Sequence, residues 1–537
     1  MNISFKNIAA YALGPMMVAS ALTACNDLNT LPDNYYVTTG QKEEAIGINP
    51  ELAKAGVVGI SSTYNQYCAV YSSAHLDFGW PSVLMILESA GIDFVSPNIG
   101  YNWFATVNEY DLGGNNNYLN NMSWYHAYKI IDSANSVLKN ISADTTDPEL
   151  QLYVAQGFAN RAYIYFNLAQ IFQFTYNGHE DLPCVPIITE ENADKAAADG
   201  APRATVREVY EQIMADLDKA IQLLSDSGLG VDHIADTGTK RFVSLATAYG
   251  LRARVNLVMN NWQAAASDAA SAIAEGNKEG IRPYSIAEAS RPAFNNANDH
   301  NLMWCVFIQP NDRVVTSGII NWPSHMGSLN YGYASVGAWR MINKSLYESI
   351  SDTDCRKGWW LDEDCLSANL NANQQALMSP RGYDPEPYTQ VKFGPYEDVL
   401  QTTTNSTSPI LMRIEEMYLI QAEATARSGG DGKSILENFV KTYRDPSYTC
   451  TLNGQEFLDE VWRQRRIELW GEGLSYFDLL RLNKPLDRRG GGWDIDWIYN
   501  VEAPLKPFLI PNNEVEANHA LGDNNPTWSK PNAVGDF

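Results

Sequence analysis

The feature that most constrains the fold is a series of apolar residues spaced three and four apart and broken by short polar turns. In residues 243–274 one apolar series runs to Val258, the turn Asn260-Asn261-Trp262 follows, and a second series built on small alanines completes the segment. Spacings of three and four place side chains on one face of an α-helix. Small alanine side chains let two helices approach closely. The segment therefore predicts two antiparallel helices joined by a tight turn.

The same pattern occurs elsewhere along the chain. Residues 413–442 divide at Gly429-Gly430 into two apolar series. Single apolar faces occur in residues 124–138, 152–173 and 205–224. Alanine-rich pairs of short helices are typical of tetratricopeptide repeats. The sequence therefore predicts a mostly α fold, in which helix pairs form a tetratricopeptide-like superhelix with long aromatic-rich loops.

Three long segments separate the predicted helices. They cover residues 94–123, 281–341 and 351–408, and they contain many of the aromatic residues of a chain that has 29 tyrosines and 14 tryptophans. Loops of this length in a compact protein either carry function or are disordered, and disordered segments contain few aromatic residues. We therefore expect these segments to be ordered and functional.

The N-terminal segment has the order of a secretory signal. Lys6 precedes a short apolar run that ends at Leu22-Thr23-Ala24-Cys25. A positive start, an apolar middle and small final residues are typical of signal peptides, and the cysteine at the cleavage position resembles a bacterial lipobox. That resemblance implies that residues 1–24 are removed and that Cys25 carries a lipid anchor, whereas in an ordinary secreted protein the cysteine would be incidental. No later stretch reaches the length of about 20 apolar residues that a membrane span requires.

The charge balance weakens the case for several partners. With 63 acidic and 38 basic residues, the net charge is −25. Such a surface repels the phosphates of nucleic acids, which makes nucleic-acid binding a poor candidate. It also repels polyanionic ligands unless a local basic pocket is present. The binding of neutral ligands is unaffected.

The sequence contains no familiar catalytic or metal motif. The seven histidines are scattered, the cysteines form no CxxC pair, and no GxSxG, P-loop or dinucleotide-binding motif occurs. We therefore predict no metal, no cofactor and no catalytic residue. Two alternatives remain open for Cys355 and Cys365, which either close a loop as a disulfide in an oxidising compartment or remain buried free thiols.

Two carboxylates suggest a glycosidase, but the arginines near them argue against it. Glu468 and Glu472 lie one helical turn apart, and glycosidases use two carboxyl groups held at a set distance. Arg465, Arg466 and Arg481 lie near them in the sequence. Neutralising arginines lower the pKa of a carboxyl group, which is the opposite of what a general acid needs. We therefore interpret the two glutamates as part of a structural ion network.

Six motifs, in order along nearly the whole chain, resemble the SusD/RagB family of outer-membrane lipoproteins from Bacteroidota. They are Trp124-Tyr125 with Ala134-Asn135, Arg161-Ala162-Tyr163 with Leu182-Pro183, Pro202-Arg203-Ala204-Thr205-Val206, Met412-Arg413-Ile414-Glu415-Glu416 with Ala422-Glu423-Ala424, Arg466-Ile467-Glu468-Leu469 with Glu472-Gly473, and Ile510-Pro511 with Asn525-Pro526. The chain departs from the family pattern at Leu474-Ser475, where an arginine is usual. It also departs at Asn26-Asp27, where a longer acidic run often follows the lipidated cysteine.

The resemblance implies a function as well as a fold. Members of this family are non-catalytic lipoproteins of the outer membrane, usually exposed at the cell surface, that capture oligosaccharides and deliver them to a SusC-like TonB-dependent transporter. By this resemblance, residues 25–230 and 231–537 are the N-terminal and C-terminal regions of one compact unit. The alternatives are a peptide-binding member of the same family, a surface glycoside hydrolase and a scaffold for other proteins.

Aromatic loop residues are the best candidates for contacts to a glycan. Sugars present flat C–H faces that aromatic rings cover, while polar side chains bind the hydroxyl groups. One candidate patch is Tyr101-Asn102-Trp103-Phe104, and a second comprises Asn321-Trp322 with Tyr331 and Tyr333. The alternative for each ring is that it packs its loop onto the helices. The predicted ligand-binding residues are Trp103, Trp322, Tyr101, Asn102 and Tyr331, with Asp77 and Trp80 as weaker candidates.

Overall fold

In the computed structural model of the chain, the described residues are 51–71, 75–96, 101–114, 117–379, 384–493 and 502–534. The predicted signal peptide, residues 1–24, and the predicted lipidation site, Cys25, lie outside them. Contacts group residues 53–537 into one unit, and the boundary expected at residue 230 stays a prediction. In the described part of the chain, no helix combines the length and apolarity needed to cross a membrane.

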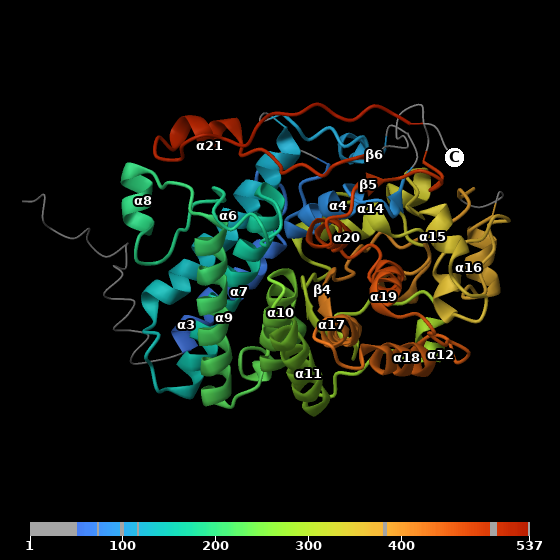
Figure 1. Cartoon of the computed structure of the whole chain (residues 1–537), viewed down its shortest axis with the longest axis horizontal. Helices are drawn as coiled ribbons and strands as arrows, with labels where there is room; N and C mark the ends of the chain where they lie inside the picture. The colour runs from blue at the N-terminus through green and yellow to red at the C-terminus, as the bar shows by residue number, and fades with distance from the viewer. Residues whose placement is uncertain are drawn as a thin grey trace, which may run out of the picture. The chain divides into compact units, whose positions relative to one another are not determined.

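Helices make up most of the secondary structure (Figure 1). The longer helices are α3 (Glu51–Tyr64), α4 (Trp80–Ser89), α6 (Tyr118–Asn140), α7 (Pro148–Phe172), α9 (Val206–Ser227), α10 (Leu245–Val258), α11 (Trp262–Lys278), α17 (Ile414–Arg427), α18 (Gly432–Tyr443) and α19 (Gly454–Glu468). The shorter helices are α5 (Ala105–Asn108), α8 (Ala193–Asp199), α12 (Ile286–Ala289), α13 (Arg313–Thr316), α14 (Trp322–Met326), α15 (Lys344–Glu348), α16 (Ala372–Leu377), α20 (Ser475–Arg481) and α21 (Asn512–Ala517). The strands are β1 (Phe94–Val95), β2 (Leu302–Cys305), β3 (Met341–Ile342), β4 (Ile410–Arg413), β5 (Leu486–Asp487) and β6 (Glu502–Ala503).

The predicted helix pairs are confirmed. Helices α10 and α11 pack side by side, as do α17 and α18, and α11 also packs on α17. The three single apolar faces belong to α6, α7 and α9, with α7 in contact with both of the others. The fold is therefore mostly α, with tetratricopeptide-like helix pairs.

Helix α9 shows why the local sequence predicts these helices. At its start, Thr205 and Glu208 form a capping box, in which each side chain accepts the backbone N–H of the other residue. This arrangement satisfies two N–H groups that have no partner inside the helix. At its end, Gly228 adopts a left-handed conformation with φ 62° and donates its N–H to the carbonyl oxygen of Leu224. Glycine adopts this conformation without steric cost, which ends the helix there.

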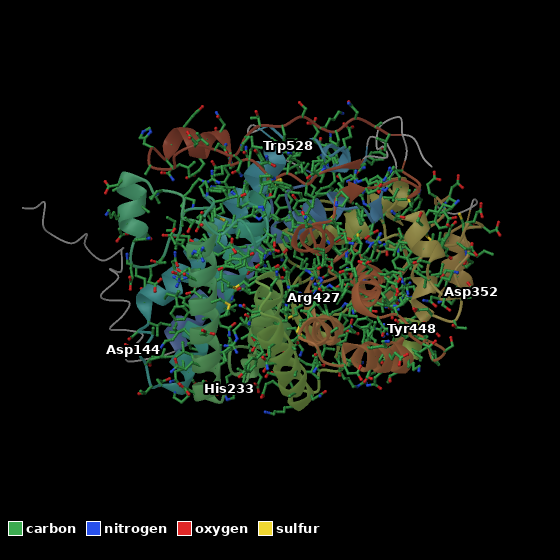
Figure 2. The ribbon with its side chains drawn as sticks, viewed as in Figure 1. Asp144, His233, Asp352, Arg427, Tyr448 and Trp528 are labelled. Atoms are coloured by element: carbon green, nitrogen blue, oxygen red, sulfur yellow. The ribbon has the colours of Figure 1, made fainter. Side chains whose placement is uncertain are left out.

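Small side chains allow close contact around α11. Ala265, Ala269 and Ala272 are fully buried where α11 packs against its neighbours. The guanidinium carbon of Arg427, labelled near the middle of Figure 2, lies 4.8 Å from the ring centre of Trp262. A cation over an aromatic face is attractive, so this contact joins the start of α11 to the end of α17.

Two short antiparallel strand pairs join segments that are distant in the sequence. In the first, β2 pairs with β4, which runs directly into α17. In the second, β1 pairs with β3, so that Phe94 lies opposite Ile342 and Val95 opposite Met341. The segments predicted as long loops contain β1, β2 and several short helices, while β3 begins at the end of the second segment and β4 follows the third. The strand pairs therefore fix the long loops to the helical part of the fold.

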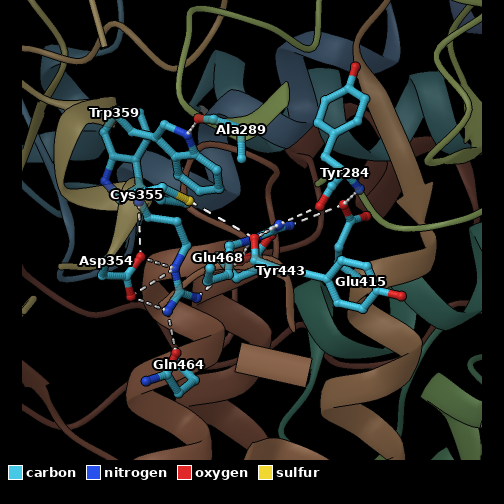
Figure 3. Close-up of polar contacts among 12 residues, drawn as sticks. Tyr284, Ala289, Asp354, Cys355, Trp359, Glu415, Tyr443, Gln464 and Glu468 are labelled. Carbon is cyan, nitrogen blue, oxygen red and sulfur yellow. Dashed lines mark hydrogen bonds and ion pairs between the residues drawn. The ribbon is translucent and has the colours of Figure 1, made fainter. Parts of the chain in front are cut away.

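The predicted ion network is present and buried (Figure 3). The carboxylate of Glu468, which Figure 3 labels, accepts hydrogen bonds from three arginines. They come from Arg444 at 2.7 and 2.8 Å, from Arg413 at 2.7 Å and from Arg356 at 3.0 Å. Glu472 pairs with Arg413 at 3.0 Å and with Lys392 at 2.7 Å. Burial alone would raise the pKa of Glu468, but the positive charges of Arg444 and Arg413 outweigh it and hold the pKa well below its usual value.

The charge partners of the network differ from those that the sequence suggested. Arg466 pairs with Asp93 at 2.6 Å, and Arg465 and Arg481 both pair with Asp478. The arginines that neutralise Glu468 come from η5 (Cys355–Trp359), from β4 and from the end of α18. The prediction of a structural role is therefore confirmed, whereas the predicted partners were only neighbours in the sequence.

Glu88 is a second buried carboxylate, and its hydrogen-bond partners are backbone amides. Its two oxygens accept the N–H groups of Gly471 at 3.0 Å and Gly473 at 2.9 Å. Burial raises the pKa of Glu88 to about 7. A carboxyl group with a raised folded-state pKa adds stability in acid, and this contribution is lost as the pH rises through the folded-state pKa.

We expect Glu88→Gln to reduce the loss of stability between pH 5 and pH 6 by about 1 kcal/mol, because glutamine has no proton to release. Urea unfolding of the wild type and the variant at both pH values measures this difference. Equal losses in the two proteins would contradict the assignment.

The last described segment returns to the N-terminal half of the chain. The Asn525 side chain donates to the carbonyl oxygen of Phe172 at 2.7 Å. Trp528, labelled in Figure 2, donates its backbone N–H to Gly113 at 3.2 Å, and its ring lies 5.0 Å from that of Tyr110. A Cβ atom at Gly113 would lie 1.7 Å from the Trp528 carbonyl oxygen, so a side chain at this position would force the segment away.

The cysteines resolve the alternative left open by the sequence. Cys355 and Cys365 are both free and half-buried. Their sulfur atoms lie 4.0 Å from the carbonyl oxygen of Tyr443 and 3.4 Å from that of Pro385, respectively. Burial raises the pKa of Cys355 to about 12, which keeps the thiol protonated and unreactive.

Candidate ligand-binding site

The pairing of β1 with β3 brings the two predicted aromatic patches together. The loop after β1 carries Tyr101 and Trp103, and the loop before β3 carries Tyr331 and Tyr333. Val95 lies opposite Met341, so Ser96 and Arg340 leave the strand pair at the same end. Residues more than 200 positions apart in the sequence therefore meet at one place.

Four rings form an aromatic cluster at this place: His75, Tyr101, Trp103 and Tyr333. The rings of His75 and Trp103 are stacked, with centres 4.4 Å apart and planes 7° apart. Tyr333 lies 6.3 Å from Trp103 and 6.4 Å from Tyr101, and its hydroxyl group is hydrogen-bonded to His75. Tyr101 is 52% exposed, Trp103 and His75 are half-buried, and Tyr333 is buried behind them.

Helix α14 contacts Tyr333, the buried ring of the cluster. The Asn321 side chain caps α14 by accepting the N–H of Ser324, and the Ser324 hydroxyl accepts the N–H of Tyr333. His325 lies with its ring 4.5 Å from that of Tyr333, and it is stacked on Phe78 at 5.1 Å. Burial lowers the pKa of His325 to about 3, so this ring is neutral at physiological pH.

Asn102 connects the exposed rings to a buried charge. Its side-chain oxygen accepts hydrogen bonds from Arg340 at 3.1 Å and from the backbone N–H of Phe104 at 3.3 Å, while its nitrogen donates to Asn108 at 3.1 Å. Arg340 is fully buried, and burial lowers its pKa to about 9, so it still carries its charge at neutral pH. These bonds hold the loop that presents Tyr101 and Trp103.

The predicted ligand-binding residues fall into three groups. Tyr101 and Trp103 belong to the aromatic cluster. Tyr331 is 46% exposed on the neighbouring loop. Its backbone N–H donates to the Thr402 carbonyl oxygen, and its carbonyl oxygen accepts a hydrogen bond from the Asn405 side chain. Asn102 is 4% exposed and positions the loop from inside. Trp322 is also 4% exposed and packs edge-on against Phe393 at 5.1 Å. A ring without an exposed face cannot stack on a sugar, so Trp322 is not part of the proposed site.

Sequence reasoning missed His75 and Arg340, whereas Tyr333 belonged to the second predicted patch. The two weaker candidates, Asp77 and Trp80, lie close to His75 in the sequence. Both are fully buried, and Asp77 is hydrogen-bonded to His126 at 2.9 Å. Tyr333 lies two residues after Tyr331 and carried the same aromatic signal. Nothing in the local sequence marks Arg340, because its partners come from the segment around Ser96 and Asn102.

The described residues offer this site no metal ligands. In that part of the chain, no group of three or more histidine, cysteine, aspartate or glutamate side chains is placed to hold a metal ion. The cluster itself combines one imidazole, one indole and two phenols. Such a set can stack on apolar faces and form hydrogen bonds to hydroxyl groups.

Two family models match the chain. A model described as "Starch-binding associating with outer membrane" covers residues 85–257, and a model described as "SusD family" covers residues 365–528. SusD-like protein P2 of Formosa agariphila is 24% identical over 468 residues, which cover 79% of this chain and 83% of that protein. SusD-like protein P38 of the same organism is 21% identical over 413 residues, or 69% of this chain and 73% of that protein.

Solved structures share the fold. A SusD-like carbohydrate binding protein from Bacteroides vulgatus aligns with a TM-score of 0.70 and 21% identity, covering 91% of this chain and 98% of that protein. Surface glycan-binding protein A from Bacteroides thetaiotaomicron, solved in complex with laminarihexaose, aligns with a TM-score of 0.59 and 17% identity, covering 89% of this chain and 99% of that protein. The motifs, the helix pairs and these matches agree, and the chain belongs to the SusD/RagB family.

Proposed function

We propose that this protein captures glycans on the aromatic cluster formed by His75, Tyr101, Trp103 and Tyr333. The observation that carries the proposal is the pair of accessible rings, Tyr101 and Trp103, held by a buried framework next to the exposed Tyr331. Rigid aromatic faces bind the C–H faces of sugars with little loss of conformational entropy. The laminarihexaose complex of a related fold supports glycans as the ligand class.

The proposal extends to the protein's place in the cell. The lipobox-like sequence that ends at Cys25 supports a lipid anchor, and family membership supports an outer-membrane location with the protein exposed at the cell surface. Family membership supports delivery of the captured glycan, unchanged, to a SusC-like TonB-dependent transporter. Mass spectrometry of the N-terminal peptide tests the anchor, and co-purification of a large barrel protein with the full chain tests the partnership.

Affinity electrophoresis tests glycan capture directly. The protein should be retarded in gels that contain a recognised polysaccharide. Laminarin and starch are the first probes, because one similar structure holds laminarihexaose and a matching family model names starch. The same protein is screened against an array of other glycans and of oligopeptides. Binding to peptides alone would favour the peptide-binding alternative, and release of reducing ends from a bound polysaccharide would favour a hydrolase.

A further inference from the structure

Arg340 has surroundings that set it apart from other buried arginines of this chain. Its Nε donates to the carbonyl oxygen of His325 at 2.8 Å, and its Nη1 donates to the Ser96 hydroxyl group and to the Asn102 amide oxygen. All three acceptors are neutral. Its Nη2 is buried and has no hydrogen-bond partner among the described residues. Arg340 forms no ion pair with a described carboxylate.

Four other buried arginines are neutralised by carboxylates. Arg161 pairs with Asp216 at 2.8 Å, Arg254 with Glu416 at 2.5 Å, and Arg413 and Arg444 with Glu468 at 2.7 Å each. A buried charge without an opposite charge is costly. In a chain with 63 acidic and 38 basic residues, a carboxylate partner is abundant in principle, so its absence at Arg340 needs an explanation.

A second cation is linked to the cluster through Tyr67. Arg313, at the start of α13, is exposed, and its guanidinium carbon lies 5.4 Å from the ring centre of Tyr67. Tyr67 in turn lies close enough to Tyr333 for the two phenols to interact electrostatically. No described carboxylate forms an ion pair with Arg313.

The acidic groups nearby are already engaged. One carboxylate oxygen of Asp312, next to Arg313, accepts hydrogen bonds from the Asn65 side chain at 2.8 Å and from the backbone N–H of Gln309 at 2.8 Å. Asp77 is bound by His126 and by two backbone N–H groups. Both carboxylates keep their negative charge, but neither forms an ion pair with Arg313 or Arg340.

We propose that the aromatic cluster takes an acidic glycan, one whose sugars carry a carboxylate or a sulfate, and that Arg313 and Arg340 supply the attraction for that charge. This inference rests on the proposed function and narrows its ligand class. Arg313 can contact the acidic group directly because it is exposed. Arg340 acts from behind Asn102, where little solvent screens its charge. Such a local basic site offsets the repulsion that a net charge of −25 imposes on an anionic ligand.

The test uses acidic oligosaccharides, each paired with a neutral counterpart. Uronic-acid oligosaccharides are compared with their carboxyl-reduced forms, and sulfated oligosaccharides with their desulfated forms, so the two arms separate the two sources of charge. We expect the acidic member of at least one pair to bind the soluble domain at least about tenfold more tightly by calorimetry. Equal or weaker binding of the acidic member in every bound pair would overturn the inference and leave glycan capture intact. Failure of all glycans, neutral and acidic, would overturn both.

Variants at Arg313 and Arg340 assign the preference to residues. Arg313→Gln should reduce the preference for the acidic member to about threefold or less while leaving the affinity for the neutral member unchanged. Arg207→Gln is the matched control, because Arg207 is also an exposed arginine and lies on α9. If the two variants bind the acidic glycan equally well, Arg313 does not supply the attraction. Arg340→Lys keeps the buried charge and should retain the preference, whereas Arg340→Met should lose it if thermal unfolding shows that the variant folds.

Discussion

Replacing Glu468 with glutamine should lower the free energy of unfolding by about 3–5 kcal/mol, the cost of breaking a buried ion pair by removing one partner. The carboxylate of Glu468 accepts hydrogen bonds from Arg356, Arg413 and Arg444, and all four side chains are inaccessible to solvent. Glutamine keeps the shape of the side chain but removes its charge. Three guanidinium groups would then share the remaining acidic partners, Asp354, Glu415 and Glu472.

Urea unfolding measures this loss, because urea is uncharged and does not screen the network. Glu456→Gln is the matched control, since Glu456 is exposed in the first turn of the same helix, α19. A loss below about 1 kcal/mol for Glu468→Gln, comparable to that of a surface substitution, would contradict the role that we assign to the network.

The same network should make the protein sensitive to acid. The folded-state pKa values of Glu468, Glu472 and Asp478 are all lowered, since the charges of nearby arginines outweigh the effect of burial. Carboxylates of this kind stabilise the fold above their unfolded-state pKa, about 4, and the contribution is lost as the pH falls below it. In Glu468→Gln, part of that acid-dependent loss should therefore be missing.

Replacing Trp103 with alanine should weaken glycan binding at least tenfold, or by at least about 1.4 kcal/mol, with little change in the melting temperature. Trp103 is half-buried, its ring is stacked on His75, and it lies on a loop rather than in the helical core. Its removal takes away the largest ring face of the aromatic cluster. Truncation of one central aromatic residue commonly costs this much at a binding site.

Calorimetry with a bound polysaccharide from the screen measures the affinity, and Trp262→Ala is the matched control. Trp262 is also half-buried, but it lies at the start of α11, under Arg427. The control should bind as the wild type does. Wild-type affinity in Trp103→Ala would show that the glycan binds elsewhere on the protein.

The helices could be predicted from the sequence because the signals that determine them are local. The capping box of Thr205 and Glu208, the turn glycine Gly228 and the alanines of α11 each act within a few residues of the chain. Apolar spacing adds the buried face. These features need no knowledge of the tertiary structure, so the fold class and the helix pairs were correct.

The site could be predicted only in part, because distant segments build it. Tyr101 and Trp103 were found through their own aromatic signal. The burial of Trp322 depends on Phe393, which lies 71 positions away, and the environment of Arg340 depends on Ser96 and Asn102 across the β1–β3 pair. The charge partners of Glu468 were missed for the same reason. Sequence patterns report spacing along the chain, and these contacts depend on spacing in three dimensions.

The contact between Gly113 and Trp528 has a consequence for biogenesis. A ribosome makes Gly113 more than 400 residues before Trp528, so the early helices must wait for the last part of the chain before their loops are covered. A chain that has not yet reached Trp528 therefore leaves this region open to proteases. Cleavage before Trp528 would expose the same loop, which is far from the cut in sequence but adjacent to it in space.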